Sequence, residues 1–412
     1  MNKKEKATSF PRLRFPQFQN YGAINFKNGN HIFEPISDRN HNSDLPVLAI
    51  TQEHGAIPRE LIDYNVTVTD KSIESYKVVQ KGDFIISLRS FQGGIEYSMF
   101  RGICSPAYII LRKKMPINEL YYKYYFKTGK FIQELNKNIE GIRDGKMVSY
   151  SQFSSLLLPM PDIKEQQKIA DCLSSLDDLI TAEDKKLEAL KKHKKGLMQK
   201  LFPAEGETVP EWRFPEFRGS GEWEKKTLGQ LGELVSGLTY SPDDIRESGL
   251  LVLRSSNIKN NRICLEDNVY VRADIKGANL SLPNDILICV RNGSKTLIGK
   301  NAIIPENMPL CTHGAFMTVF RTKKAKFVFQ LLQTDAYEKQ VKADLGATIN
   351  SINGTKLKKY VFYLPKDPKE QQKIADFLSC LDTLITAQAE KIEFLRDHKK
   401  GLMQDLFPSI RR

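Results

Sequence analysis

The chain has 412 residues, of which 41% are hydrophobic and 27% charged, and its formal net charge is +13. This length allows two or three domains of ordinary globular composition. No apolar run reaches the roughly 18–20 residues that a membrane-spanning helix requires, so we expect no membrane span. The excess of positive charge favours an anionic partner, of which nucleic acid is the commonest, although a merely basic surface would give the same balance.

The first residues and the cysteines favour a cytoplasmic protein. Residues Met1–Phe10 are partly basic, but no apolar stretch follows them, so they do not resemble a secretory signal. The six cysteines are scattered, without a CxxC pair or the histidine spacing of a zinc site. We therefore expect reduced thiols and no bound metal.

In chain order, the sequence consists of one unit that occurs twice. Each unit opens with a short leader, continues through a globular region and ends in a long helix. The leader PRLRFPQF at Pro11–Phe18 returns as PEWRFPEF at Pro210–Phe217. The counterparts within the globular regions are Lys81–Arg89 (KGDFIISLR) with Pro283–Arg291 (PNDILICVR), and Ser105–Arg112 (SPAYIILR) with Gly314–Arg321 (GAFMTVFR).

Between these segments the two globular regions hardly match, and both predict a mixed α/β fold. Short β-branched or aromatic runs such as FIIS, YIIL, ILICV and MTVF are bounded by Gly, Pro and Asn, which predicts strands. Helices are expected at Asn118–Asn138 and Lys326–Leu345. The first of these is rich in tyrosine, which could stack on bases but more often builds a core.

The closing helices, Lys164–Pro203 and Lys369–Pro408, differ at only 11 of their 40 positions and lie 205 residues apart. Asp162 and Asp367 can cap their starts, each with a glutamate three residues further on. A proline follows each helix at its end. These signals predict two helices of nearly equal length.

Apolar residues in both helices alternate at steps of four and three, the a/d pattern of a coiled coil. Polar residues interrupt the pattern at Glu183, Lys194, Gln388 and Lys399. Two matching stripes in one chain favour antiparallel pairing of the helices over packing of each helix on its own domain. We call these residues the seam: Ile169, Leu173, Leu176, Ile180, Leu187, Leu190, Leu197 and Leu201, with Ile374, Leu378, Leu381, Ile385, Ile392, Leu395, Leu402 and Leu406.

A helix from Glu165 to Lys194 is about 45 Å long at 1.5 Å per residue. Two DNA half-sites read from one face of the duplex lie roughly 34 Å apart. Paired helices of this length could therefore hold two DNA-reading domains about one turn apart.

With these features the chain resembles the specificity subunit of type I restriction–modification enzymes. The resemblance is carried by the EQQKIAD segment leading to HKKGLMQ and LFP, present twice, with the RFP leaders and the KGD-type strand entries. It covers essentially the whole chain. One departure is visible, because the second domain opens with WEKKTLGQLGEL from Trp223, as is typical of the family, whereas the first has no Trp after Phe18.

The resemblance implies an α+β fold, in which two mixed α/β target-recognition domains are separated by two long helices forming an antiparallel coiled coil, with a pseudo-two-fold internal repeat. The expected boundaries are 1–161 for the first recognition domain, 162–203 for the first spacer helix, 204–218 for a linker, 219–366 for the second recognition domain, 367–408 for the second spacer helix and 409–412 for a tail.

The resemblance also implies a noncatalytic subunit. Each recognition domain would read one half of a split, asymmetric site in double-stranded DNA, and the coiled coil would set the gap. Two copies of an adenine methyltransferase subunit and two copies of an ATP-dependent restriction subunit would complete the enzyme. S-adenosylmethionine, ATP and magnesium would be bound by those partners, and no cofactor by this chain.

Polar and basic side chains in loops next to strands are the candidates for DNA contact, because arginine can pair with guanine, and asparagine or glutamine with adenine. They occupy corresponding places in the two halves, although each could instead merely cap a strand. The candidates are Thr51, Gln52, Arg89, Ser90, Gln92, Arg143 and Lys146 in the first half, and Arg254, Ser255, Ser256, Asn257, Arg291, Asn292, Ser294, Lys295, Asn350 and Lys356 in the second.

Catalytic interpretations find little support. A methyltransferase would need a polar-Pro-Pro-aromatic motif, and the sequence has no Pro-Pro pair. The stretch GSKTLIGKN at Gly293–Asn301 resembles a phosphate-binding loop but has one residue too many between its glycines. A nuclease site combining Asp162, Glu183 and Lys185 would stretch along about 31 Å of one helix. A standalone DNA-binding protein or a coiled-coil scaffold remains the alternative to a subunit with methyltransferase partners.

Overall fold

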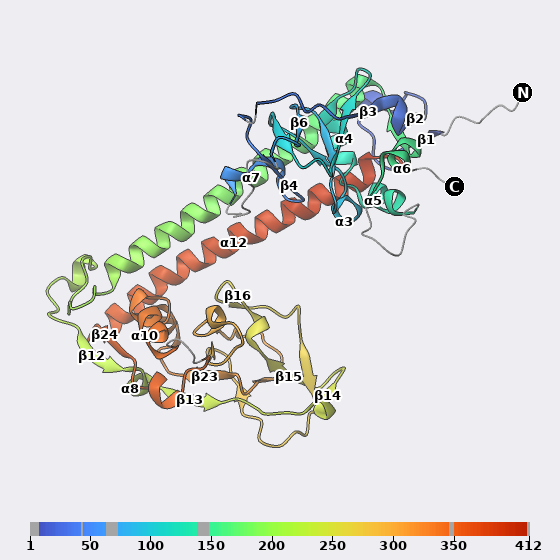
Figure 1. Cartoon of the computed structure of the whole chain (residues 1–412). Helices are drawn as coiled ribbons and strands as arrows, with labels where there is room; N and C mark the ends of the chain where they lie inside the picture. Colours follow the sequence, from blue (N-terminus) through green and yellow to red (C-terminus); the bar gives the residue numbers. More distant parts are fainter. Residues whose placement is uncertain (1–7, 43, 63–72, 138–147, 346–349, 410–412) are drawn as a thin grey trace, which may run out of the picture. The chain divides into compact units, whose positions relative to one another are not determined.

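The structure is a computed structural model that describes residues 8–42, 44–62, 73–137, 148–345 and 350–409 (Figure 1). The chain forms two compact units: unit 1 comprises Met1–Asp184 and Glu390–Arg412, and unit 2 comprises Lys185–Ala389. Each unit therefore holds one globular region, the first half of the long helix that follows it, and the second half of the other long helix.

Unit 1 has a mixed α/β globular region of small antiparallel sheets, with strand orders β1-β2-β11, β3-β10-β7-β8, β4-β5 and β6-β9. Its strands are β1 (Thr8–Ser9), β2 (Ile24–Asn28), β3 (Phe33–Ile36), β4 (Leu48–Thr51), β5 (Gly55–Pro58), β6 (Lys77–Val79), β7 (Phe84–Ile86), β8 (Glu96–Tyr97), β9 (Gly102–Cys104), β10 (Ile109–Lys113) and β11 (Leu157–Met160). Its helices are η1 (Pro16–Phe18), α1 (Gly29–Ile32), η2 (Arg59–Leu61), α3 (Ser90–Gly93), α4 (Glu119–Tyr125), α5 (Gly129–Asn136) and α6 (Tyr150–Ser155).

Unit 2 has larger sheets, with strand orders β12-β24, β13-β23-β20-β21-β17-β16 and β14-β18-β15-β22-β19, in which β15–β22 and β17–β21 pair in parallel. Its strands are β12 (Glu224–Thr227), β13 (Glu233–Ser236), β14 (Ile245–Arg246), β15 (Leu250–Leu253), β16 (Ile258–Lys259), β17 (Arg262–Ile263), β18 (Val269–Val271), β19 (Leu280–Ser281), β20 (Ile286–Cys289), β21 (Asn301–Ile303), β22 (Cys311–His313), β23 (Met317–Arg321) and β24 (Val361–Leu364). Its helices are η3 (Pro215–Phe217), α8 (Leu228–Leu231), η4 (Pro242–Asp244), η5 (Ser255–Asn257), η6 (Lys295–Leu297), α9 (Ala325–Leu331), α10 (Asp335–Leu345) and α11 (Gly354–Leu357).

The repeated strand motifs occupy the same place in both units. In unit 1, β7 pairs with β10 in antiparallel orientation, and in unit 2, β20 pairs with β23 in the matching register. The aspartate before the first strand of each pair binds the arginine at the end of the second. Asp83 accepts two hydrogen bonds from Arg112 at 2.8 and 2.7 Å, and Asp285 accepts two from Arg321 at 2.9 and 2.7 Å.

The tyrosine-rich segment belongs to the core of unit 1, where Tyr121 and Tyr122 are fully buried among phenylalanines. The single helix expected at 118–138 is wrong, because the chain forms α4 and α5 with a break at Thr128. The Thr128 hydroxyl accepts a hydrogen bond from Phe131 N at 3.3 Å and so caps a new helix. The helix expected at 326–345 is likewise divided, into α9 and α10.

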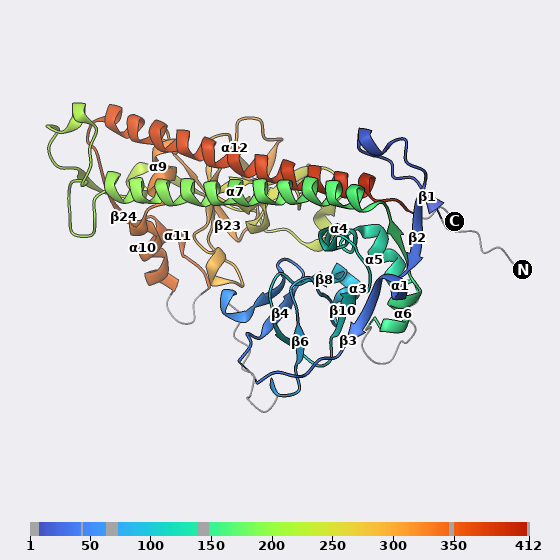
Figure 2. The same cartoon turned by 90° about the horizontal axis from the view of Figure 1, so that it is seen from above.

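The repeated 40-residue segments form α7 (Ile163–Leu201) and α12 (Pro368–Leu406), each 39 residues long. Their expected caps are present, since Asp162 accepts from Lys164 N and Asp367 from Lys369 N, both at 2.8 Å. In both Figure 1 and Figure 2 the two helices lie side by side. The prediction of two equal helices is confirmed.

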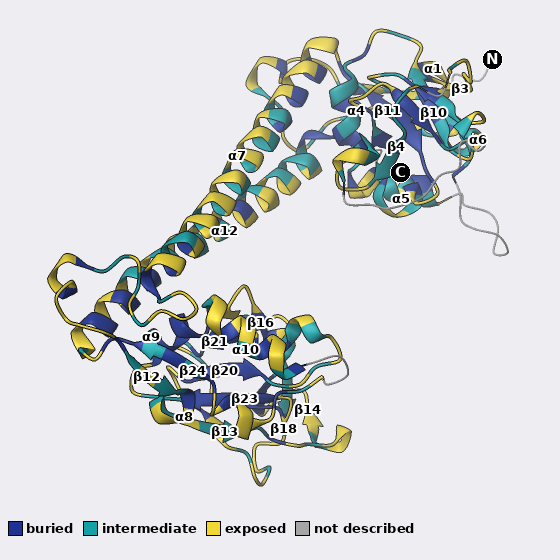
Figure 3. Ribbon diagram, turned by 60° about the vertical axis from the view of Figure 1, so that its left-hand side comes forward, coloured by how far each residue is buried: buried dark blue, intermediate teal, exposed yellow. Residues whose placement is uncertain are grey.

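Contacts within each unit show that α7 and α12 pair in antiparallel orientation. In unit 1, the start of α7 packs against the end of α12, where Ile169 and Leu173 share a core with Leu406 and Phe407. In unit 2, Leu201 at the end of α7 shares a core with the start of α12. Every seam residue is at least partly buried, whereas the outward faces are exposed (Figure 3).

The charged interruptions of the seam, Glu183, Lys194 and Lys399, are paired across the helices. In unit 2, Lys194 Nζ donates to Asp382 Oδ1 at 2.6 Å, and in unit 1, Lys399 binds Asp177. The two pairs are counterparts in the repeat. Glu183, also in unit 1, accepts from Lys391 Nζ at 2.5 Å. Buried charges are tolerated at these places because each finds an opposite charge.

Each leader fixes the start of the long helix in its own unit. Arg14 donates two hydrogen bonds to Glu165, both at 2.8 Å, and Arg213 donates two to Glu370 at 2.6 and 2.7 Å. The glutamate carboxylates are at most 2% exposed. These glutamates therefore bind the leader arginines, and their spacing from the capping aspartates did not predict this interaction.

The missing tryptophan does not change the opening of the first region. In unit 1, β2 pairs with β11 and leads into α1, just as β12 pairs with β24 and leads into α8 in unit 2. Within the described residues, no helix combines the length and apolar character needed to cross a bilayer.

Candidate nucleic-acid interface

Three of the loops singled out in the second region meet on one face of unit 2. The first loop follows β15 (residues 254–256) and the second follows β20 (291–295). The third contains residue 350. Asn292 Nδ2 donates to Ser255 Oγ at 2.9 Å, which joins the first two loops. Asn292 N lies 3.4 Å from Asn350 O, and Arg291 forms a β-bridge with Ser351, which joins the third. We call this set of loops the unit 2 face.

Not every candidate in unit 2 is available to a ligand. Asn257 is 0% exposed, and its amide donates to Cys264 O at 3.0 Å and Asp267 O at 3.2 Å, so it holds the turn after β15. Arg254 is committed to Asp267, with Nη2 2.8 Å from the carboxylate. We therefore remove Asn257 from the proposed reading residues.

The remaining candidates in unit 2 differ in how far they are available. Ser256, Arg291 and Ser294 are exposed, whereas Lys295 is half-buried. Lys356 lies on α11, and its ammonium group faces Asp344 at 3.4 Å. This contact does not place Lys356 on the unit 2 face.

In unit 1, two of the predicted segments come together. The side chain of Gln52, in the turn after β4, lies so close to Gly93 that a Cβ there would be 2.5 Å from Gln52 Cδ. Gly93 ends α3, which also carries the exposed Gln92 and follows the exposed Arg89. Gln52, Arg89 and Gln92 form what we call the unit 1 face.

The other candidates in unit 1 have structural roles or lie outside the described residues. Ser90 is 1% exposed, and its hydroxyl accepts from Ser87 N at 2.8 Å, so it is removed from the proposed reading residues. Thr51 Oγ1 donates to Gly55 O at 3.2 Å and accepts from His54 N at 3.0 Å, which fixes the hairpin turn. Arg143 and Lys146 lie outside the described residues.

The unit 2 face includes one aromatic residue that sequence reasoning missed. Phe316 lies in the turn between β22 and β23 and is 56% exposed. Its carbonyl accepts hydrogen bonds from Val290 N and Arg291 N, both at 3.0 Å. The Arg291 guanidinium lies over the ring, 5.7 Å from its centroid. The available signal was an aromatic residue at a Gly-Ala turn directly after a strand.

A buried histidine lies in the strand that leads to this turn. His313 is 0% exposed, with Nε2 donating to Val235 O at 3.0 Å and Nδ1 accepting from Ser281 Oγ at 2.9 Å. Burial lowers the pKa of His313, because the charged form would lose its hydration. The imidazole is therefore a neutral structural group in the fold.

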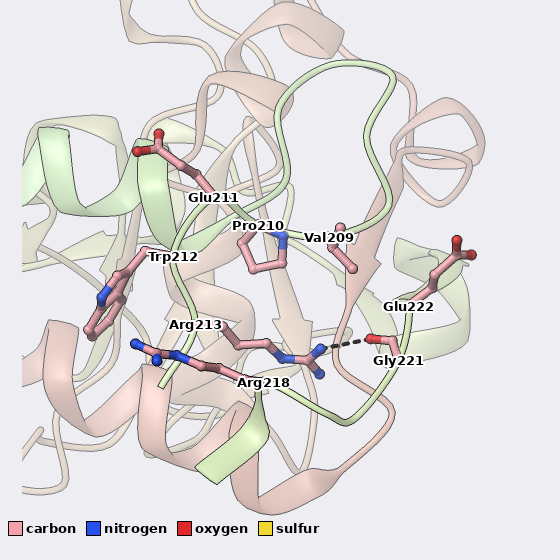
Figure 4. Close-up of a pocket in the computed structure, with 8 residues that line it drawn as sticks. All are labelled: Val209, Pro210, Glu211, Trp212, Arg213, Arg218, Gly221 and Glu222. Atoms are coloured by element: carbon pink, nitrogen blue, oxygen red, sulfur yellow. Dashed lines mark hydrogen bonds between the residues drawn. The ribbon is translucent and has the colours of Figure 1, made fainter. Parts of the chain in front are cut away.

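Each leader also borders a surface hollow. In unit 2, a hollow of about 540 Å³ is lined by residues 209–213, 218, 221 and 222. Figure 4 shows Arg213 reaching to the carbonyl of Gly221, a hydrogen bond of 2.7 Å. In unit 1, a hollow of about 360 Å³ lies between the leader and the first turns of α7, lined by Gln17, Phe18, Tyr21, Lys164, Gln167, Lys168 and Asp171. In both units, the lining includes parts of the repeated sequence.

Comparison with known proteins identifies one family. The family model described as type I restriction modification DNA specificity domain matches twice, at residues 22–192 and 220–395. These two matches together cover most of the chain.

Relatives and solved structures agree with that match. The type I restriction enzyme MjaVIII specificity subunit of Methanocaldococcus jannaschii is 27% identical over 355 residues, covering 82% of this chain and 80% of that relative. The EcoKI specificity subunit of Escherichia coli is 28% identical over 173 residues, 40% of this chain and 36% of that relative. The S subunit of a type I restriction-modification system from M. genitalium shares the fold, with a TM-score of 0.60 at 16% identity, covering 97% of this chain and 100% of that chain. A chain from a type I R-M system has a TM-score of 0.56 at 15% identity, covering 94% of this chain and 98% of that chain.

Proposed function

Because this chain belongs to the type I restriction modification DNA specificity family, we propose that its two recognition domains read the two halves of a split, asymmetric site in double-stranded DNA. The observation that carries the proposal is the repeat itself. Two helices that are nearly identical in sequence accompany two faces that differ. Different faces suit different half-sites, whereas equal helices suit a function performed twice.

The paired helices would set the gap between the half-sites. Each is a single helix of 39 residues, about 58 Å at 1.5 Å per residue. Their seam is apolar along most of its length and ion-paired at Glu183, Lys194 and Lys399, which favours one fixed register. A fixed register is what a molecular spacer requires.

Two copies of an adenine methyltransferase subunit would dock on the repeated surfaces. The leaders and the first turns of the long helices occur once in each unit, and most of these residues are the same in both copies. This chain would contribute recognition and no chemistry. S-adenosylmethionine would be bound by the methyltransferase subunits, and ATP and magnesium by two restriction subunits that complete a cytoplasmic, ATP-dependent endonuclease.

Co-purification tests the partner assignment. The full chain, expressed with a candidate adenine methyltransferase, should form a stable complex with two methyltransferase copies per chain. A standalone DNA-binding protein or a coiled-coil scaffold would purify alone. Methylome sequencing of the expressing cells should then show methylated adenines in two half-sites at a constant gap.

Insertion of residues tests the spacer. Four residues added after Ala182 and four after Ala387 lengthen each helix by about 6 Å. The gap in the methylated site should grow by one or two base pairs, while the half-sites stay the same. An unchanged gap in a folded, methylating complex would contradict the spacer function.

Domain exchange tests whether each recognition domain reads its own half-site. Replacing only Gly219–Leu364 by the corresponding region of a relative should change one half-site and leave the other unchanged. Simultaneous change of both half-sites would contradict independent reading by the two domains.

A further inference from the structure

Arg291 has no acidic partner in the described part of the chain, unlike several other arginines of unit 2. Arg213 binds Glu370, Arg254 binds Asp267 and Arg321 binds Asp285. No carboxylate lies within 4.0 Å of the Arg291 guanidinium among the described residues, and the side chain is exposed. An arginine held without a counter-ion on a binding face is available for an anionic or hydrogen-bond-accepting ligand.

The backbone of Arg291 is nevertheless firmly held. Its N–H donates to Phe316 O at 3.0 Å, and on its other side it bridges Ser351. The next residue, Asn292, is fixed by its bond to Ser255. The Phe316 ring lies below the guanidinium at 5.7 Å, a distance at which a cation and an aromatic face attract each other. This support reduces the rotamer entropy that the arginine would lose on binding.

From this arrangement we infer that Arg291 and Phe316 form a single base-reading element in the major groove. The guanidinium pairs with O6 and N7 of a guanine, and the exposed edge of the phenyl ring packs against the C5 methyl group of a neighbouring thymine. These are the contacts for which the two side chains are chemically suited. The inference rests on the proposed function and adds which residues read which bases in the half-site of unit 2.

The counterpart in unit 1 lacks this element. Because β10 and β23 pair in matching registers with β7 and β20, Phe316 corresponds to Ala107. The counterpart of Arg291 is Arg89, whose N–H donates instead to Ser87 Oγ at 3.3 Å. A large aromatic ring in one unit and a methyl group in the other provide a physical reason for two different half-sites.

Modified bases test each contact separately. The complex of the full chain with its methyltransferase subunit is bound to duplexes carrying the mapped site, at one fixed salt concentration. Each guanine of the unit 2 half-site is replaced in turn by 7-deazaguanine, and each thymine by deoxyuridine. Wild-type binding should weaken by about 5- to 160-fold at one guanine, which corresponds to about 1–3 kcal/mol. It should weaken by about fourfold at one thymine, as expected for one buried methyl group.

Variants assign the effects to residues. In Arg291→Ala and Arg291→Lys the sensitivity to 7-deazaguanine should disappear, and in Phe316→Ala the sensitivity to deoxyuridine should disappear. Leu310→Ala is the matched control, because Leu310 is 69% exposed but precedes β22 whereas Phe316 follows it. This control and the unit 1 half-site should keep wild-type behaviour.

The outcomes separate this inference from the proposed function. A unit 2 half-site without guanine or thymine, or variants that keep the full wild-type sensitivities, would overturn the base-reading element while leaving split-site recognition intact. A complex that binds all sequences equally would overturn the proposed function itself.

Discussion

The partly buried ion pair in the unit 2 seam offers a quantitative test of how the helices are held. Lys194 replaces an apolar residue in the a/d pattern, and its side chain is 10% exposed, whereas that of Asp382 is 38% exposed. Removal of Lys194 leaves a carboxylate that is still bound by Gln330 Nε2 at 2.8 Å. The cost should therefore lie between that of an exposed pair, below 1 kcal/mol, and that of a fully buried pair, about 3–5 kcal/mol. We expect Lys194→Ala to destabilise unit 2 by about 2 kcal/mol.

Tryptophan fluorescence measures this cost selectively. The chain has two tryptophans, Trp212 and Trp223, and both belong to unit 2. With a urea m-value of about 2–3 kcal/mol/M for a unit of this size, the fluorescence midpoint should fall by about 0.7–1 M. Lys194→Met keeps the apolar stem and should cost less than Lys194→Ala.

A double-mutant cycle isolates the pair itself. Lys194→Met, Asp382→Asn and the double variant should show a coupling energy of about 1 kcal/mol. The counterpart pair in unit 1, Lys399 with Asp177, provides the control, since Lys399→Met should leave the tryptophan transition unchanged if the units unfold separately. A coupling below about 0.3 kcal/mol would refute the view that the seam charges stabilise the pairing.

The remaining predictions concern the leader, the buried histidine and the unit 1 face. Arg213→Ala should lower the stability of unit 2 by about 3 kcal/mol, because Glu370 would stay buried without its partner; urea unfolding followed by tryptophan fluorescence measures this. Burial lowers the pKa of His313 in the folded state, so on acidification the unfolded state takes up the proton at a higher pH than the folded state does. The contribution of neutral His313 to stability is therefore complete above about pH 6.5 and is lost as the pH falls below it. Between pH 5 and 8, the urea midpoint of the His313→Gln variant should therefore depend less on pH than that of the wild type. Gly93→Ala should displace Gln52 and change the first half-site in the methylome with little loss of stability.

Two of these predictions, those for Arg213 and Gly93, have a control in the same chain. Arg14→Ala removes the equivalent arginine–glutamate pair in unit 1 and should not shift the unfolding transition detected by tryptophan fluorescence. Gly129→Ala adds a methyl group where no atom lies within 4 Å, so it should leave the first half-site unchanged. A methylome altered equally by both glycine variants would contradict a specific role for Gln52.

The long helices were predictable because their signals are local. Cap, apolar spacing and terminal proline all lie within 40 residues, and the structure places both helices within two residues of the predicted ends. The partners of the charged interruptions were not predictable. Lys194 finds Asp382 188 positions away in the chain, and Lys399 finds Asp177 222 positions away, and neither aspartate lies in the a/d pattern.

In the globular regions, strand motifs were predicted but helix lengths were not. The break at Thr128 had a local signal, a Thr-Gly pair that can start a new helix, which the tyrosine-rich pattern obscured. The candidate faces were located only as loops. Which side chains remain free depends on the turn that each loop adopts, and Asn257 and Ser90 are used within those turns.

The seam and the reading domains are joined through the same two aspartates. Asp177 accepts from Tyr124 OH at 2.8 Å, and Asp382 accepts from Gln330 Nε2 at the same distance. Tyr124 lies in α4 and Gln330 lies in α9, so each reading domain contributes one donor to a seam aspartate in its own unit.

This connection places a condition on domain exchange. A domain inserted for Gly219–Leu364 has to supply a donor where Gln330 now stands, because a hydrogen bond to a charged group contributes about 1.5–3 kcal/mol. Gln330→Met, which keeps the side-chain volume, should therefore lower the stability detected by tryptophan fluorescence by that amount. Gln330→Tyr introduces the residue type that donates to the corresponding aspartate in unit 1, and it should retain part of that stability. An exchanged domain with an apolar residue at this position that kept full stability and an unchanged gap would show that reading domain and seam are energetically independent.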